Sequence, residues 1–214
     1  MNRKIKLDEP IIPTVIDKIN FQDIFYEEEP YLSNGLIENT LIENERIDLL
    51  TLSKIHLKNV TFIDSTFYQI DMTDVIFENC DLSNLDLSNA RLNRVRFERC
   101  KLLGSNFTKA NISNSIFNEC IANLTNFAEA RFKQVIFDEA SLRNAYFYDC
   151  VLNKVGFENC DINDIDFTDT SLKGIDLSTS SFQHITLDLE SLRGCTVSTE
   201  QAIGFASLLG LKIV

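Results

Sequence analysis

Six cysteines are the side chains in this sequence with the widest chemical range, and they are regularly placed. Each falls at a position that ends in 0 or 5: Cys80, Cys100, Cys120, Cys150, Cys160 and Cys195. Thiols that came together in the fold could form disulfides, bind a metal or act in redox chemistry. Metal sites usually contain close Cys-x-x-Cys pairs, which are missing here, and the only imidazole ligands are His56 and His184. We therefore expect the cysteines to be small apolar fillers, with no metal site.

Other groups that could act in catalysis are present only as scattered residues. The sequence has no glycine-rich phosphate loop and no set of nucleophile, base and orienting residue. Single Ser, Asp and His side chains are common on any polar surface. We therefore expect a protein that is not an enzyme and that needs no cofactor.

Carboxylates are the second group of candidate functional residues. The formal net charge is −12, which argues against direct binding to nucleic acid, because that affinity comes from neutralising phosphates. Acids gather in a block with a single lysine among them: Glu158, Asp161, Asp164, Asp166, Asp169 and Asp176. We predict that this block is an acidic face that binds a partner protein. The alternative is an ordinary solvated surface.

A five-residue repeat determines how these side chains are positioned. From residue 52 to residue 187 every fifth residue is large and apolar, except Ala122, and 13 of the 16 phenylalanines occupy these central positions. Two residues before each centre the side chain is apolar or small, and the other three positions are mostly polar. Neither a helix nor an ordinary strand has this period, so the pattern predicts a solenoid whose units stack on one another.

The repeat resembles the A(D/N)LXX pattern of the pentapeptide-repeat family. Good examples are residues 80–84 (Cys-Asp-Leu-Ser-Asn), 105–109 (Ser-Asn-Phe-Thr-Lys) and 110–114 (Ala-Asn-Ile-Ser-Asn). The resemblance implies an all-β fold, a right-handed quadrilateral parallel β-helix with four pentads in each coil. Stacked coils lie about 4.8 Å apart. One side of the core then becomes a ladder of rings: Phe77, Phe97, Phe117, Phe137 and Phe157.

The two ends depart from the repeat and divide the chain into three parts. Residues 1–49 are expected to form an irregular N-terminal cap and a first imperfect coil, and Asn34-Gly35 is a turn signal typical of a hairpin. Residues 50–197 are expected to form the β-helix. In residues 198–214, Ser198-Thr-Glu-Gln201 has the form of a capping box that opens a short helix, and an apolar strand follows.

This C-terminal module is predicted to mediate dimerisation. A helix alone is enough to plug the last coil, so an apolar segment after it points to pairing with a second chain. The expected interface residues are Ile203, Ala206, Leu209, Leu211 and Ile213. The alternative is that the segment only covers the end of the solenoid.

The N-terminal residues indicate no export signal. The basic start is followed by acids and prolines instead of an apolar stretch, and no run of the sequence is long enough to span a membrane. We therefore expect a cytoplasmic protein with no membrane association.

Three C-terminal segments resemble one subgroup of the pentapeptide-repeat family. Residues 171–176 (Ser-Leu-Lys-Gly-Ile-Asp), 199–203 (Thr-Glu-Gln-Ala-Ile) and 208–214 (Leu-Leu-Gly-Leu-Lys-Ile-Val) are similar to the end of chromosomal Qnr-type proteins of Gram-positive bacteria. Qnr and MfpA proteins are rod-shaped dimers that bind DNA gyrase and topoisomerase IV, are proposed to mimic duplex DNA, and lower susceptibility to fluoroquinolones. The resemblance implies the same function and a C-terminal homodimer here. The alternative is a non-catalytic interaction scaffold with another protein partner.

Two further features of the repeat bear on binding. Plasmid-borne Qnr proteins of Gram-negative bacteria carry projecting loops that are important for protection, and the unbroken register predicts none between residues 52 and 187. In addition, Ile76, Ile116 and Ile136 share one outward column. That column is either a contact strip or an ordinary scatter of apolar surface residues.

Overall fold

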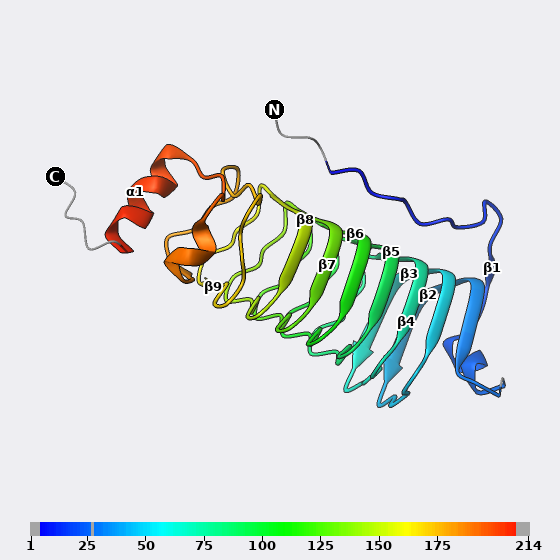
Figure 1. Ribbon diagram of the computed structural model, residues 1–214. Helices are drawn as coiled ribbons and strands as arrows, with labels where there is room; N and C mark the ends of the chain where they lie inside the picture. The colour runs from blue at the N-terminus through cyan, green and yellow to red at the C-terminus, as the bar shows by residue number, and fades with distance from the viewer. Residues whose placement is uncertain (1–4, 27, 209–214) are drawn as a thin grey trace.

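The computed structural model describes residues 5–26 and 28–208 and forms a rod (Figure 1). Eight parallel strands follow one another along its axis in chain order and make one sheet. They are β1 (Asp17–Lys18), β2 (Tyr31–Glu43), β3 (Thr51–Ile63), β4 (Asp71–Glu78), β5 (Arg91–Glu98), β6 (Asn111–Asn118), β7 (Arg131–Asp138) and β8 (Val151–Glu158). A second, two-stranded sheet pairs β9 (Ile165–Asp166) with β10 (Ile185–Thr186).

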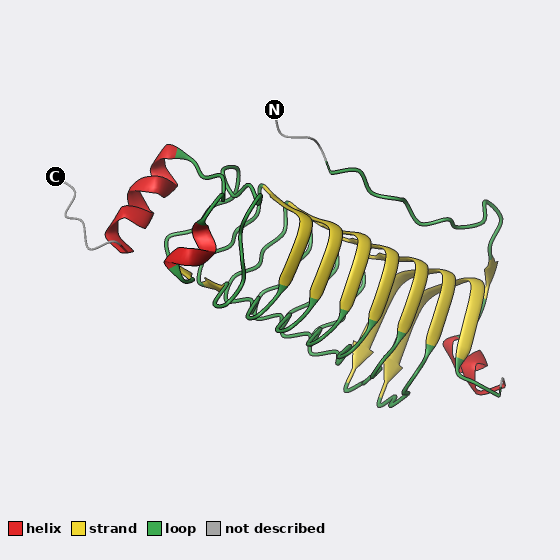
Figure 2. Cartoon of the chain, viewed as in Figure 1, coloured by secondary structure: helices red, strands yellow, loops and turns green. Residues whose placement is uncertain are grey.

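Each coil of the rod contains four pentads. Strand partners are 20 residues apart from β2 to β8, as in the pairs Leu57↔Phe77 and Phe77↔Phe97. The two sides without long strands keep the same interval through single parallel bridges, such as Thr66↔Asp86. Figure 2 shows the strands stacked on one side and the connecting turns on the other. The predicted all-β class, a parallel β-helix with a short C-terminal helix, is confirmed.

The inward side chains form a continuous core with two aromatic ladders. In the first, the ring centroids of Phe97 and Phe117 are 4.6 Å apart and the rings are nearly parallel, at 7°. In the second, the centroids of Phe107 and Phe127 are 5.2 Å apart. Rings of the two ladders meet edge to face, as for Phe107 and Phe117 at 86°. The rings are brought into these contacts by the backbone pairing, which repeats every 20 residues.

A left-handed residue in every pentad lets the chain turn the corners of the coil. From residue 34 to residue 174 every fifth residue has positive φ, and the residues other than glycine have values between 47° and 61°. Asparagine is the commonest residue there, because its short polar side chain tolerates this conformation. The series has no gap, so no projecting loop interrupts the coils between these residues.

The parallel pairing begins before residue 50. β2 pairs with β3 over its whole length, at the 20-residue interval of the later coils. The hairpin expected at Asn34-Gly35 is wrong: Asn34 has a φ of 52° because it occupies the left-handed corner of a pentad. Gly35 replaces the usual inward side chain because Ile19 fills that space; a Cβ on Gly35 would lie 2.1 Å from Ile19 Cδ1. The 3-10 helix η1 (Phe21–Tyr26) precedes this coil.

At the C-terminal end, the 3-10 helix η2 (Leu189–Leu192) and helix α1 (Thr199–Leu208) follow the last coils. The predicted capping box is present: Gln201 N–H donates to Ser198 Oγ (3.2 Å), and Ser198 N–H donates to Gln201 Oε1 (2.8 Å). Gln201 Nε2 also donates to the carbonyls of Leu177 and Ser180, at 2.8 Å each. One residue therefore both starts the helix and attaches it to the solenoid.

The single small centre, Ala122, has a counterpart across the core. Both Ala122 and Phe132 are buried, and Phe132 comes half a coil later, on the opposite side. The other central residues in the column of Phe132 are smaller, for example Leu92 and Ile112. We infer that the large ring fills the volume that Ala122 leaves.

Ala122→Leu alone is expected to lower the free energy of unfolding by about 1–3 kcal/mol, because it overpacks a filled core. In the double variant Ala122→Leu/Phe132→Leu the loss should be smaller than the sum of the two single losses, by about 1 kcal/mol. Urea unfolding of the four proteins measures this coupling. Additive losses would contradict the volume compensation.

Candidate protein-binding surface

A column of carboxylates runs along one edge of the rod. The last positions of β4, β5, β7 and β8 are in register, which places Glu78, Glu98, Asp138 and Glu158 above one another with Asn118 between the two pairs. Exposed Glu119 and Glu139 follow in the adjacent left-handed corner. We call Glu119, Asp138, Glu139 and Glu158 the first acidic column. Its regular spacing is a direct consequence of the repeat.

The two halves of this edge differ in how the charges are compensated. Glu78 lies 3.2 Å from Lys58 Nζ, and Glu98 lies 2.8 Å from Arg96. By contrast, the carboxylates of the first acidic column have no cation of the described residues within 4.0 Å. The uncompensated negative charge is thus at the C-terminal half of the edge.

A second acidic column lies half a coil away, on the opposite corner. It consists of Glu129, Asp149 and Asp169, all exposed and all at left-handed positions. The exposed Tyr148 lies among them. Asp169 chiefly, through its charge and a hydrogen bond, and then Asp149 and Glu129 raise the pKa of the Tyr148 phenol. The tyrosine therefore stays neutral and presents an aromatic ring within a negative surface.

Charge is divided unequally along the rod. Residues 50–118 contain eight Lys and Arg against seven Asp and Glu, whereas residues 119–176 contain five against eleven. Fields from like charges on one body add up over a distance comparable to the Debye length, about 8 Å at physiological salt. The C-terminal half is therefore the part of the rod that would attract a basic partner.

The acidic block identified from the sequence forms a belt around this half instead of one flat face. Glu158 belongs to the first acidic column and Asp169 to the second. Asp161 and Asp164 lie on the side between these two columns, and Asp166 lies in β9. Asp176 occupies the same position as Gly156, one coil later. Their binding role remains a prediction. Glu119, Glu129, Asp138, Glu139 and Asp149 were missed, because they are neighbours only when the outward positions are aligned at the coil interval.

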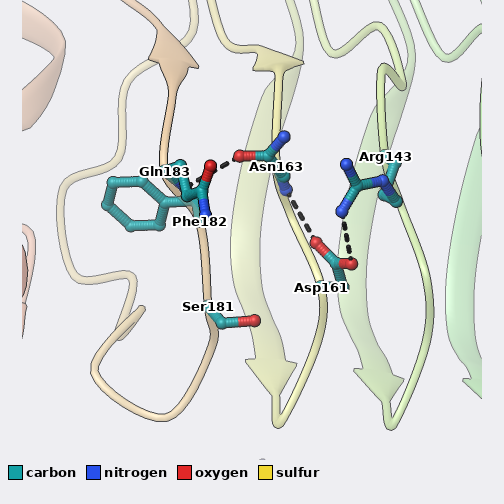
Figure 3. A pocket seen from close by; sticks show the side chains of 6 residues that line it. All are labelled: Arg143, Asp161, Asn163, Ser181, Phe182 and Gln183. Atoms are coloured by element: carbon teal, nitrogen blue, oxygen red, sulfur yellow. Dashed lines mark hydrogen bonds and ion pairs between the residues drawn. The ribbon is translucent and has the colours of Figure 1, made fainter.

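Several belt acids already have partners within the chain. Asp161 accepts a hydrogen bond from Arg143 Nη1 at 2.9 Å, and both line an open pocket of about 240 Å³ (Figure 3). In the same pocket Asn163 Oδ1 accepts the N–H groups of Gln183 and His184, at 2.8 and 3.1 Å. Asp161, Arg143, Asn163 and Gln183 are thus linked by hydrogen bonds within the pocket.

The cysteines lie inside the solenoid as free thiols. Cys80, Cys100, Cys120, Cys150 and Cys160 are buried, and Cys195 is half-buried. Cys100 Sγ, for example, donates to the Phe77 carbonyl at 3.4 Å. Burial raises the pKa of Cys150 and Cys160 to about 12 and that of Cys195 to about 11. Within residues 5–26 and 28–208 no three His, Cys, Asp or Glu side chains are grouped to bind a metal ion.

The predicted dimer residues are only partly within the described chain. Ile203 on α1 is 52% exposed, whereas Phe205 of the same helix is buried against Phe182, with 5.4 Å between ring centroids. Ala206 lines an apolar pocket of about 250 Å³ between α1 and the last coil, together with Leu192 and Cys195. Leu209, Leu211 and Ile213 lie outside the described residues. Dimerisation therefore remains a prediction.

Among the described residues, the helices are too short or too polar to span a membrane.

The geometry defines a repeat protein of the β-helix class whose varied side chains lie on the outside of its coils. Residues 90–167 match the family model for the pentapeptide repeat region, and the same coils continue on both sides of that match. Residues 90–167 are therefore a pentapeptide repeat region. No curated protein matches the sequence.

Solved structures that are similar to this chain include QnrB1 and HetL. A trypsin-treated variant of QnrB1, a plasmid-mediated fluoroquinolone resistance protein, is 20% identical with a TM-score of 0.52, over 92% of this chain and 95% of that chain. HetL, a pentapeptide repeat protein involved in heterocyst differentiation regulation from the cyanobacterium Nostoc, is 14% identical with a TM-score of 0.33, over 82% and 92%. The similarity to QnrB1 supports the fold.

The thiols should be inert in the native protein. At pH 8 a thiol with a pKa of about 11 or 12 is protonated, and only the thiolate reacts. We expect N-ethylmaleimide to add at most one group, at Cys195, with a rate that rises towards pH 10, and to add six in denaturant. Peptide mass spectrometry locates the adducts. Rapid native labelling of Cys100 or Cys120 would contradict their role as core residues.

Proposed function

We propose that this protein is a DNA mimic that binds DNA gyrase and topoisomerase IV and protects them from fluoroquinolones. The observation that carries the proposal is the pair of acidic columns on the C-terminal half of a straight rod. Further support comes from the shared fold with QnrB1, a fluoroquinolone resistance protein. The proposed partners imply a cytoplasmic location.

The spacing of the acidic columns is similar to that of DNA phosphates, so the columns would suit a partner surface that binds DNA. Coils repeat about every 4.8 Å, while the charges on one DNA strand repeat about every 3.4 Å along the axis. Two columns on opposite corners would therefore present two lines of negative charge at a density approaching that of the two DNA strands. A basic groove would attract such a rod from a distance and accelerate its association.

A homodimer through the C-terminal module would extend this surface. If two chains met at α1, the acidic halves would be adjacent and the less charged N-terminal halves would be at the far ends. Ile203 and the apolar pocket beside Ala206 supply exposed apolar surface at that end of the rod. The dimer would thus be most negative at its centre.

The second candidate function is that of an interaction scaffold with a different protein partner. It is favoured by the unbroken coils between residues 34 and 174, which leave no projecting loop to reach into a drug site. Under this alternative the acidic columns would bind another basic protein. Gyrase activity distinguishes the two candidates.

The test is DNA supercoiling by gyrase of a Gram-positive host, titrated with the protein in the presence and absence of ciprofloxacin. We expect supercoiling to be restored in the presence of the drug. Inhibition without restoration would show binding without protection. No effect in either arm, with topoisomerase IV decatenation also unchanged, would contradict the proposal and favour the scaffold.

A matched pair of variants tests the role of the first acidic column. Asp138→Lys/Glu139→Lys/Glu158→Lys should weaken gyrase binding about tenfold or more, because repulsion replaces attraction at the contact. The control Glu43→Lys/Asp48→Lys/Asp64→Lys makes the same change in net charge on exposed positions of the first coils. Equal losses in both variants would mean that only net charge matters and that the column is not a contact surface.

A further inference from the structure

The N-terminal segment lies lengthwise against one side of the rod. Figure 1 shows it leaving β1 and passing back along the strands towards β8. Two hydrogen bonds hold it there: Ile11 N–H donates to Asp74 Oδ1 on β4, and Gln134 Nε2 on β7 donates to the Lys6 carbonyl, each at 2.9 Å. With Ile5 beside Gly156 of β8, residues 5–12, which we call the arm, span five strands.

The surface beneath the arm is apolar at the end near β8. Ile76, Ile116 and Ile136 share an outward column, in which Arg96 stands between the first two and Gly156 follows the last. Ile136 points away from the core, yet it is only 7% exposed. At Gly156 an added Cβ would lie 3.2 Å from Ile5 Cδ1, so the missing side chain makes room for the arm. The arm thus packs on the Ile136 and Gly156 end of this column.

The charges of the arm and of this surface are complementary. Glu9 forms an ion pair with Arg96, whose other nitrogen contacts Glu98 at 2.8 Å. Arg94 is held by Asp74 at 2.6 Å, and this contact, with a smaller contribution from Asp8, raises the pKa of its guanidinium. Glu9 therefore pairs with Arg96 of β5, whereas Arg94 is bound within the rod by Asp74.

These contacts make a weak attachment that involves no strand pairing. The arm crosses the strands instead of extending the sheet, and no β-strand is formed within residues 5–16. The ion pair of Glu9 is largely exposed, and such pairs contribute about 0.2–1 kcal/mol. The β-helix has its own closed core, so the arm can leave this surface without opening it.

We propose that the outer face of β4–β8 is a binding surface for an extended peptide with an apolar end and a carboxylate further on, which residues 5–12 occupy in cis and the same segment of a second copy can occupy in trans. Gly156, beside the buried Ile136, accepts the apolar side chain, and Arg96 selects the carboxylate. This proposal does not depend on gyrase binding.

The test uses full-length proteins and a fluorescent peptide of residues 5–13, with binding followed by anisotropy. Asp8→Arg/Glu9→Arg puts a like charge opposite Arg96, adds a second positive charge beside it, releases the arm and leaves the surface beneath it intact. If the native arm occupies this surface about nine-tenths of the time, the peptide should bind this variant about tenfold more tightly than the wild type. Glu28→Arg/Glu29→Arg, the same charge change on exposed residues away from this surface, should behave as the wild type.

Exchanging the charges of Arg96 and Glu9 tests whether Arg96 binds the carboxylate of the peptide. Arg96→Glu also releases the arm, but it should bind the wild-type peptide poorly and a peptide that carries Glu9→Arg well. Equal binding of the peptide to the wild type and to the released variant would overturn the proposal. The proposal would also be overturned if the wild-type peptide failed to bind Asp8→Arg/Glu9→Arg and the Glu9→Arg peptide failed to bind Arg96→Glu, while thermal unfolding showed that both proteins were folded.

Discussion

The structure depends on one constraint: every coil must fit between two others that are almost identical to it. Two inward side chains in each pentad, one small and one large, meet the equivalent side chains about 4.8 Å above and below. The parallel hydrogen bonds keep this interval, and the stacked rings of Phe97 and Phe117 exploit it. A change of register by one residue would move the core residues to the surface, so a one-residue insertion within a strand is more disruptive than a substitution at an outward position.

This constraint leaves the outward positions free, and function is therefore expected there. Three of five residues in each pentad can vary without disturbing the core, and the coil turns any preference at one position into a line along the rod. The acidic columns arise in this way, and so do the isoleucine column and the arginines of β5. A β-helix thus converts a short sequence preference into a long surface with regularly spaced charges.

The core was predictable from the sequence because each inward side chain obeys a local rule that is repeated many times. The phenylalanine ladder and the capping box at Ser198 and Gln201 were both predicted correctly, since each depends on spacing alone. Asn34-Gly35 was misjudged because the same left-handed residue serves a hairpin and a pentad corner. The arm was not foreseen, because its contacts join an irregular segment to outward positions that do not repeat. Asp138 and Glu139 were overlooked for a related reason: they are far in sequence from the other acids of their column.

The central claim is that the acidic half of the rod occupies the DNA-binding surface of gyrase. The most direct measurement is displacement of a fluorescent DNA duplex from gyrase by this protein at several salt concentrations. The account predicts competitive displacement that weakens as salt rises, and that is lost with Asp138→Lys/Glu139→Lys/Glu158→Lys. Simultaneous binding of duplex and protein to gyrase, or displacement that the variant retains in full, would contradict it.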